Sequence, residues 1–428
     1  MQKKKVLIIS YYWPPAGGPG VQRWLKFVKY LPDFGIEPTI FTPENPSYPL
    51  VDNSLLSEVP KDIKVIKTKI WEPYQIAEKL NKKNKKFKAG QFDIGGNQSW
   101  KSKLSIWIRG NFFIPDARIF WVKPSIQFLK KHLENHYYDA IITSGPPHSL
   151  HLIGLGLKKE NPNLKWIADF RDPWTEISYY QHLKLSHRSD KKHRFLEKEV
   201  FKNADITLAT SYTDAENFKR KGANAICITN GFDTEIQRGE NKKTTKFTLS
   251  YVGVLEQLRN PEILWEVLEE LVIENENFRN DFQLKFVGKI DDTIQEKWNN
   301  LNNSFVNLGY LPHSKAVEEM QNADILLLTN FPNENSKGII PGKIFEYLAT
   351  QKTILAFGCQ GADVEKILQK TNAGKHFTYT QKEEVKAFIL EQYQIWKTEK
   401  PPIKNLNIAE FSRKNLTEKL ANVLKFIP

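Results

Sequence analysis

Short runs of strand-forming residues alternate with helix-length segments along almost the whole chain, and no other feature limits the possible folds as strongly. In the first half of the chain we expect strands at residues 6–10, 39–42, 63–67, 140–143, 166–170, 206–209 and 225–228. Strands that are separated by helices form parallel sheets with helices on both faces. The pattern therefore predicts an α/β fold.

A polar and charged stretch, residues 234–246, separates this series from a second one. It has no hydrophobic periodicity, which is typical of an exposed linker. After it we expect strands at residues 248–252, 283–287, 306–308, 325–328 and 353–356, with helices such as 262–275 and 343–350 between them. The predicted domains are a doubly wound, Rossmann-like domain over residues 1–235, a linker over 236–246, a second such domain over 247–405 and a C-terminal helix over 406–428.

The composition excludes several classes of protein. The 428 residues are 40% hydrophobic and 26% charged, which is not the composition of a disordered chain. Cys227 and Cys359 form no Cys-x-x-Cys pair, so we expect neither a disulfide scaffold nor a zinc site, and a reducing compartment fits best. No apolar run is long enough to span a membrane, and the short first run ends in Pro14 and Pro15, which argues against a secretory signal. We expect a cytoplasmic protein.

The 62 Lys and Arg residues exceed the 49 Asp and Glu residues, which leaves a net charge of +13. This balance favours anionic partners, such as nucleic acid, phosphorylated small molecules or an acidic membrane surface. Part of the charge is concentrated in a lysine-rich insertion at residues 79–96. The insertion is either a solvated charge run or a contact for anionic lipid headgroups, and residues 79–88 are the candidate membrane contact.

Glycines gather between the first predicted strand and the first predicted helix, where backbone amides can approach an anion or a sugar. They are Gly17, Gly18 and Gly20. Arg23 stands where the third glycine of a dinucleotide-binding motif would fall, which makes an NAD enzyme a weak interpretation. A turn explains one or two of these glycines, but three beside several prolines favour a loop that forms a site.

Two segments of the second half could bind a diphosphate. Gly342 and Lys343 begin a predicted helix, and Glu346 follows one turn later, where it could accept hydrogen bonds from ribose hydroxyls. Gly253 follows a strand, and Arg259 precedes the next helix with a planar cation that suits phosphate. The alternatives are an ordinary surface pair of Lys and Glu and an exposed arginine.

Charged residues also follow a strand of the first half. Asp169, Arg171 and Asp172 come at the carboxyl end of the strand at 166–170, the side on which open α/β sheets bind ligands. An internal Asp–Arg ion pair that fixes the loop is the alternative. His148 and His151 begin the preceding helix, and a hydrogen-bonding or acid/base histidine is favoured over metal binding because no third ligand has a recognisable spacing.

In their order and spacing, these segments resemble the retaining GT-B glycosyltransferases, and most closely the bacterial glycosyltransferase family 4. The motifs that carry the resemblance are YYWPPAGGPGVQR, TSGPPHSLHLIG, ADFRDPW, ITNGFD, SYVGVL, LGYLP, NADILLL and IPGKIFEYLATQK, which together span almost the whole chain. The resemblance implies two Rossmann-like domains that face a central cleft, with a C-terminal helix that packs back on the first domain. It also implies acceptor contacts mostly from the first domain and donor contacts mostly from the second.

The resemblance also implies roles for single residues. Glu346 matches the family glutamate that holds the donor ribose, and Arg259 falls where the family has a diphosphate-binding lysine. The chain departs from the family at Val254, where many members have an arginine, and at Gly338, which replaces the first of two paired glutamates. Lys343 could supply the missing positive charge.

The predicted site residues fall into three groups. The expected catalytic group is Arg259, Lys343, Asp172, Arg171 and His148. Arg171 and Asp172 are included because they fall near the position where several relatives carry an acceptor-side histidine. The donor group is Gly18, Gly253, Arg259, Gly342, Lys343 and Glu346. The acceptor-side group is Gly17, Gly20, His151 and Asp169.

The expected activity is transfer of a sugar from a nucleoside-diphosphate sugar, UDP or GDP, to a hydroxyl acceptor with retention, without a metal or other cofactor. The acceptor would be a carbohydrate or a lipid-linked sugar in bacterial cell-surface polysaccharide or glycolipid biosynthesis, on the inner face of the cytoplasmic membrane. The alternatives are a GT-B sugar-nucleotide epimerase and a noncatalytic binder of anionic polymers. We expect no nucleic-acid partner, because the sequence has no clustered aromatic and basic motif.

Overall fold

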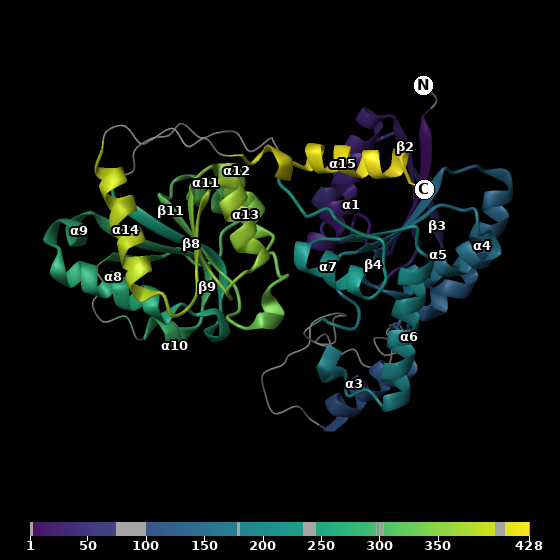
Figure 1. Cartoon of the computed structure of the whole chain (residues 1–428), viewed down its shortest axis with the longest axis horizontal. Helices are drawn as coiled ribbons and strands as arrows, with labels where there is room; N and C mark the ends of the chain where they lie inside the picture. The colour runs from purple at the N-terminus through teal and green to yellow at the C-terminus, as the bar shows by residue number, and fades with distance from the viewer. Residues whose placement is uncertain are drawn as a thin grey trace. The chain divides into compact units, whose positions relative to one another are not determined.

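The computed structural model describes residues 3–73, 100–177, 180–233, 245–296, 298, 301, 304–398 and 407–427. The lysine-rich residues 79–88 and most of the predicted linker lie outside these ranges. The chain forms two compact units, the first made of Met1–Thr229 with Lys414–Pro428 and the second of Asn230–Arg413. Each unit is a parallel sheet covered by helices, which confirms the predicted α/β fold (Figure 1).

The first unit contains a seven-stranded sheet in the order β3-β2-β1-β4-β5-β6-β7, and all pairings are parallel. Its central strands are apolar along their whole length because helices cover both faces. The strands are β1 (Lys4–Ser10), β2 (Ile36–Pro43), β3 (Lys64–Thr68), β4 (Ala140–Gly145), β5 (Trp166–Phe170), β6 (Ile206–Ala209) and β7 (Ala225–Cys227). All seven predicted strands of this half are confirmed within a few residues.

The helices of the first unit follow the amphipathic pattern of the sequence. They are α1 (Pro19–Tyr30), α3 (Trp100–Phe112), α4 (Ile119–Asn135), α5 (Ser149–Glu160), α6 (His187–Asn203) and α7 (Tyr212–Arg220), with the short 3-10 turns η1 (Leu31–Phe34), η2 (Asn53–Glu58) and η3 (Tyr180–Leu183).

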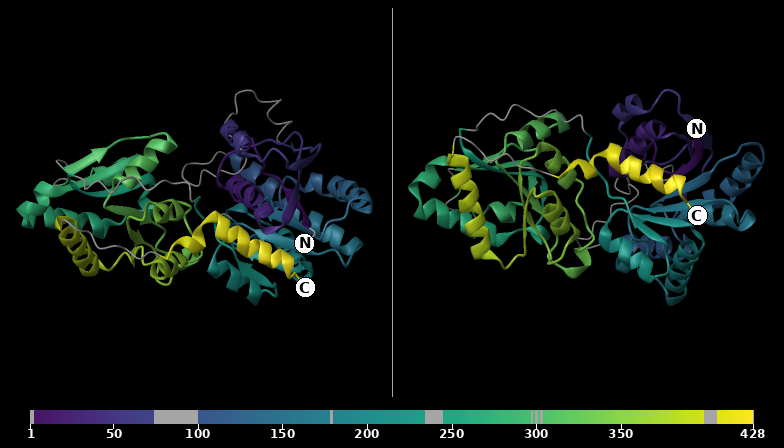
Figure 2. Two further views of the ribbon diagram at one scale, coloured as in Figure 1. Left: turned by 90° about the horizontal axis from the view of Figure 1, so that it is seen from above. Right: turned by 45° about the horizontal axis from the view of Figure 1, so that its top comes forward.

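The last helix of the chain, α15 (Arg413–Lys425), completes the first unit (Figure 2). Leu416, Leu420 and Leu424 recur at helical spacing and are buried in the core formed by β1, α1 and neighbouring strands. The Lys4 Nζ donates a hydrogen bond to the Leu424 carbonyl oxygen at 3.3 Å. The expected packing of the C-terminal helix on the first domain is confirmed.

The second unit contains a six-stranded parallel sheet in the order β10-β9-β8-β11-β12-β13. Its strands are β8 (Phe247–Leu255), β9 (Phe282–Ile290), β10 (Phe305–Asn307), β11 (Ile325–Thr329), β12 (Thr353–Phe357) and β13 (Gly374–Phe377). The sequence predicts the first five of these strands but not β13, an edge strand that carries two polar residues in four positions.

The helices of the second unit lie on both faces of the sheet, with α8 and α14 on one face and α11, α12 and α13 on the other (Figure 1). They are α8 (Glu262–Glu274), α9 (Glu276–Asp281), α10 (Asp292–Gln295), α11 (His313–Gln321), α12 (Lys343–Thr350), α13 (Asp363–Thr371) and α14 (Lys382–Lys397), with the turns η4 (Gln257–Arg259), η6 (Glu334–Ser336) and η7 (Ala409–Phe411). No helix among the described residues of either unit is both long and apolar enough to cross a bilayer.

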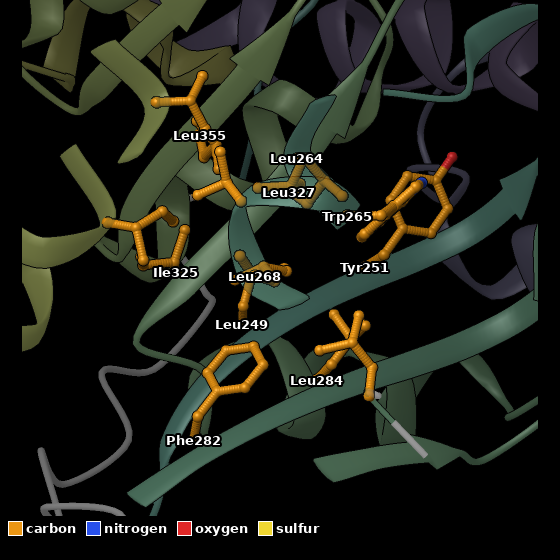
Figure 3. Close-up of a cluster of buried hydrophobic side chains, with 14 of the residues drawn as sticks. Leu249, Tyr251, Leu264, Trp265, Leu268, Phe282, Leu284, Ile325, Leu327 and Leu355 are labelled. Atoms are coloured by element: carbon orange, nitrogen blue, oxygen red, sulfur yellow. The ribbon is translucent and has the colours of Figure 1, made fainter. Parts of the chain in front are cut away.

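The core of the second unit shows why α8 forms where it does. Leu264, Leu268 and Leu271 lie one turn apart and are buried against the apolar side chains of β8 and β9. Figure 3 shows Leu264, Trp265 and Leu268 facing Leu249, Leu284 and Leu327 from the neighbouring strands. This core fixes the strand ends where the candidate site residues lie.

Both sheets reverse their strand order at one point. In the first sheet β1 has neighbours on both sides that follow it in the chain, β2 and β4, and in the second sheet β8 stands between β9 and β11. Ligands of doubly wound sheets bind outside the carboxyl ends of the strands at such a reversal. The loops after β1 and β8 are therefore the places where the fold positions a site.

Candidate functional site

Lys343 and Gly253 lie in contact at the carboxyl end of β8. Gly253 has φ 126°, and the Lys343 side chain occupies the space that a β-carbon on Gly253 would need. Only glycine lets the ammonium group approach the strand so closely. The Lys343 Nζ also lies 4.6 Å from the centroid of the Tyr251 ring, which is a cation–π contact.

Arg259 ends η4 a few residues beyond β8. Its Nη2 donates to the Val254 carbonyl oxygen at 3.3 Å and lies 3.1 Å from the Glu256 carboxylate. Its guanidinium carbon lies 5.4 Å from the centroid of the Phe331 ring. The Nε is buried and makes no hydrogen bond within the described part of the chain. Arg259 therefore keeps donor capacity that an anion could use.

The charges of Lys343 and Arg259 act on each other. Burial and, to a smaller extent, the positive charge of Arg259 lower the pKa of Lys343 to about 8, although Glu346 opposes the effect. No carboxylate of the described residues lies within ion-pair distance of the Lys343 ammonium group. A bound anion would stabilise the charged form of this lysine.

Glu346 and Gly342 flank Lys343 on α12. The Glu346 Oε1 lies 3.4 Å from the His313 Nε2, where His313 is exposed and Glu346 is partly exposed. Its carboxylate therefore retains lone pairs for a ligand. Gly342 precedes the helix, and a β-carbon there would meet no atom within 4 Å. The structure thus brings together five of the six predicted donor residues, while Gly18 belongs to the first unit.

Asp169 is fully buried in the first unit, and its carboxylate binds other side chains of that unit. Its Oδ1 lies 3.0 Å from the Arg23 Nη2, and its Oδ2 accepts hydrogen bonds from the Trp24 Nε1 at 2.8 Å and the Ser144 Oγ at 2.9 Å. The ion pair that the sequence left open as an alternative therefore exists, but its partner is Arg23 and not Arg171. This geometry favours a structural role for Asp169, and its acceptor role stays a prediction.

Arg171 lies against the glycine loop. Its guanidinium group occupies the space that a β-carbon on Gly20 would need, and its Nη2 donates to the Pro146 carbonyl oxygen. Its Nε is buried without a hydrogen bond to any described residue, and burial lowers the pKa of Arg171. Asp172 follows it and is exposed. The structure therefore places Arg171, a predicted catalytic residue, beside Gly20, a predicted acceptor-side residue, and the roles of both stay predictions.

The other two glycines of this loop have different surroundings. The Gly17 N–H donates to the Leu50 carbonyl oxygen at 2.9 Å, and a β-carbon on Gly17 would collide with the Leu50 side chain. Gly18 is the N-cap of α1, with φ 93° and open space beside it. Gly17 is thus explained by packing, whereas Gly18 combines a conformation that favours glycine with room for a ligand.

His148 and His151 lie at the start of α5 and are both buried. Burial lowers the pKa of His151 to about 3 and lowers that of His148 well below its usual range. The His151 Nδ1 lies 2.9 Å from the Thr143 Oγ1, and the His148 ring stacks on Trp174 with centroids 5.2 Å apart. Both histidines are therefore neutral at physiological pH.

Among the described residues, no group of three or more His, Cys, Asp or Glu side chains could hold a metal ion. The sequence reasoning missed three residues that the structure brings into these sites, namely Arg23, Tyr251 and His313. Tyr251 could have been found, because side chains two residues apart in a strand share a face and Gly253 was already a candidate. Arg23 and His313 contact residues that are distant in the sequence, and no local pattern reveals them.

No protein-family model and no curated protein matches the chain. Solved structures do match it over almost its whole length. The galactosyltransferase WaaB of the lipopolysaccharide outer core, in its apo form, is 13% identical with a TM-score of 0.57 and covers 99% of each chain. Anabaena HepE in complex with UDP-glucose is 13% identical with a TM-score of 0.57, over 98% of this chain and 99% of that one.

A putative UDP-N-acetylglucosamine 2-epimerase from Listeria monocytogenes is 11% identical with a TM-score of 0.50, over 99% of this chain and 96% of that one. At such low identity these likenesses show the fold alone. The fold is the α/β arrangement of two Rossmann-like domains that the GT-B resemblance implies.

Proposed function

We propose that the protein is a glycosyltransferase that moves a sugar from a nucleoside-diphosphate sugar to a hydroxyl group with retention at the anomeric carbon. The observation that carries the proposal is the pair of cations at the reversal point of the second sheet. Arg259 and Lys343 lie close enough for one charge to depress the pKa of the other. An anion would offset the repulsion between two like charges that are held together and partly buried, and a diphosphate supplies two negative groups.

The same pair of cations suits the difficult step of the reaction. The bond between the anomeric carbon and the diphosphate oxygen breaks, and negative charge grows on the leaving oxygens while the sugar becomes oxocarbenium-like. Arg259 and Lys343 stabilise that charge without rearrangement, which lowers the barrier electrostatically.

The acceptor oxygen then forms its bond to the anomeric carbon on the face that the diphosphate leaves, and this preserves the configuration. The acceptor proton passes to the departing phosphate oxygen. The buried and neutral His148 and His151 are not required as bases, and Arg171 and Asp172 contact the acceptor.

Glu346 binds the ribose hydroxyls of the donor through its partly exposed carboxylate. Val254 stands where many members of the similar family have an arginine, and Gly338 stands where they have a glutamate. This chain therefore lacks one cation after the strand and one carboxylate before the helix. We expect Lys343 to supply the positive charge of the missing arginine, because its ammonium group reaches Gly253, the residue before Val254. The reaction needs no metal in this proposal, since the two side chains carry the charge stabilisation.

The HepE structure holds UDP-glucose and WaaB is a lipopolysaccharide galactosyltransferase, which supports a nucleotide sugar as donor and a cell-surface glycan or glycolipid as product. We place the reaction on the cytoplasmic side of the membrane with a carbohydrate or lipid-linked acceptor. The second candidate is a sugar-nucleotide epimerase, which the likeness to the Listeria epimerase motivates.

A thermal-shift panel of UDP-, GDP-, ADP- and CMP-sugars tests the donor site, because a ligand that binds only the folded state raises its melting temperature. We expect one nucleotide to raise the Tm of the wild type but not of Lys343→Ala, and Lys397→Ala, an exposed lysine on α14, serves as the matched control. If no nucleotide sugar shifts the Tm of the wild type, the donor-site assignment is wrong.

A reaction assay separates the two candidate functions. Nucleoside diphosphate that is released only when an acceptor is present indicates transfer, and interconversion of the sugar without an acceptor indicates epimerisation.

A further inference from the structure

Six of the exposed large apolar side chains of the first unit lie on α3, at the start of α4 and shortly after β3. Four are aromatic and exposed over wide areas, with Trp71 at 48%, Trp107 at 41%, Phe112 at 67% and Phe120 at 42% of their full exposure. Together with two aliphatic residues of α3 they form a surface that we call the aromatic face, made of Trp71, Leu104, Trp107, Ile108, Phe112 and Phe120.

Ring contacts and helical spacing join the residues of the aromatic face into two groups. On α3, Leu104, Trp107 and Ile108 recur at helical spacing and share one side of the helix. The Trp107 and Phe112 rings lie 5.7 Å apart, and Phe120 of α4 lies 4.6 Å from Trp71. Phe113 follows Phe112 in the chain, and its ring lies 5.9 Å from that of Phe120. A monomeric soluble protein rarely leaves so large an apolar surface open without a partner.

Exposed cations lie in or next to the segments that carry the aromatic face. Lys69 lies two residues before Trp71, and Lys123 lies one turn after Phe120 on α4. On the far side of α3 the Asn111 Nδ2 donates to the Lys184 carbonyl oxygen at 3.2 Å, which places Lys184, and Arg188 shortly after it, at the helix end. None of these four cations forms an ion pair with another described residue.

The acidic residues of the same segments do not offset these charges. Residues 64–73, 100–123 and 180–188 contain only two, Glu72 and Asp116. Glu72 is fully buried and lies 3.0 Å from the Arg118 Nε, and Asp116 accepts hydrogen bonds from the Ser149 N–H and Oγ. Both carboxylates are therefore occupied inside the unit, and the exposed charges of these segments are positive.

We propose that the aromatic face docks onto the headgroup region of an anionic lipid bilayer. Tryptophan and phenylalanine with flanking lysine and arginine are the composition that binds at this boundary, where the rings enter the apolar layer and the cations meet the phosphates. The positive surround selects a negatively charged partner over a neutral apolar one. The aromatic face is defined without residues 79–88 and does not rest on the transfer reaction proposed above.

Sedimentation of the full chain with lipid vesicles tests the proposal. We expect the wild type to bind vesicles of phosphatidylglycerol and phosphatidylcholine, to bind pure phosphatidylcholine vesicles weakly, and to dissociate as salt is raised. Trp107→Ser with Phe112→Ser should weaken binding on the order of tenfold through lost ring insertion. Lys184→Glu with Arg188→Glu should weaken it on the order of tenfold or more, and only in the anionic vesicles.

Tyr137→Ser and Lys131→Glu are the matched controls, because both residues are exposed on or next to the distant end of α4. Unchanged binding of both controls, with an unchanged Tm for all variants, supports the proposal. It is overturned if the wild type does not bind anionic vesicles or if the controls lose binding equally. It is also overturned if ultracentrifugation shows a dimer that only the variants of the aromatic face dissociate, since the occupant would then be a second copy of the chain.

Discussion

Both units place charges near the carboxyl ends of the strands of a parallel sheet, but the surroundings of these charges differ. At the carboxyl end of β5 in the first sheet, Asp169 is buried and paired with Arg23, and further hydrogen bonds satisfy its second oxygen. At the reversal point of the second sheet, Lys343 forms no ion pair with a described residue, and the Nε of the neighbouring Arg259 makes no hydrogen bond to one. The charge of Asp169 is therefore balanced inside the first unit, whereas Lys343 and Arg259 of the second unit can still bind an anionic ligand.

The difference separates residues that hold the fold from residues that could perform chemistry. A buried pair that is fully hydrogen-bonded costs much to break and offers little to a ligand. A partly buried cation with a depressed pKa is costly to keep, and such residues concentrate at functional sites. We therefore expect substitutions in the first group to change stability and substitutions in the second group to change activity.

The largest effect on stability should follow from Asp169→Asn. The change leaves the Arg23 charge buried without its partner, and such losses cost about 3–5 kcal/mol. Chemical unfolding of the variant measures the loss. Glu216→Gln on α7 is the control, because its ion pair with Lys219 is exposed and should contribute below about 0.5 kcal/mol. Wild-type stability combined with lost transfer would move Asp169 from the structural group to the site.

The next effect should be on the rate. Arg259→Ala removes a donor aimed at the leaving diphosphate, so we expect transfer to slow by about 10²–10³-fold while the Tm stays near that of the wild type. Steady-state kinetics with the identified donor measures this effect. Arg220→Ala at the end of α7 should leave the rate unchanged. Equal losses of rate and stability for Arg259→Ala would place this arginine with the structural residues.

A pair of glycine substitutions sharpens the assignment of Lys343. Gly253→Ala forces a side chain into the space of the Lys343 ammonium group at a positive φ, which should cost about 1–3 kcal/mol and displace the cation. Gly342→Ala adds a β-carbon in open space at φ −54° and should change stability little. Nucleotide binding and the Tm of both variants check this contrast. Identical behaviour would remove the reason for a glycine at position 253.

The smallest effect concerns pH. The lowered pKa of Lys343, about 8, means that its positive charge disappears as the pH rises through this value. Affinity for a nucleoside diphosphate should therefore fall above pH 8, by at most about tenfold per pH unit. Calorimetric titrations across this range measure the slope, and Lys343→Arg should flatten it because arginine stays protonated. The same slope in Lys343→Arg would assign the titration to another group.

The fold was more predictable from the sequence than the sites. Strands such as Trp166–Phe170 and Ile325–Thr329 are buried apolar runs, and local composition identifies them. The sequence did not predict strand β13, because Lys375 and His376 make half of it polar. Its pairing with β12 becomes visible only in the assembled sheet.

Within the sites, predictability depended on distance along the chain. The candidates Gly253, Arg259 and Lys343 follow strand ends or begin a helix, and these positions can be read locally. Asp169 and Arg23 are 146 residues apart in the sequence, so the partner of this buried carboxylate appears only when the sheet is assembled. The sequence identifies residues at the carboxyl ends of the strands, but it does not show which of their charges are balanced by an ion pair.

The position of α15 has a consequence for how the protein is made. Leu416, Leu420 and Leu424 belong to the core of the first unit, yet the ribosome adds them after the whole second unit. While the second unit emerges, the nascent first unit exposes the apolar surface that α15 later covers. Its folding can finish only after the second unit and α15 have been synthesised, so the first unit cannot complete its core before the second unit is made.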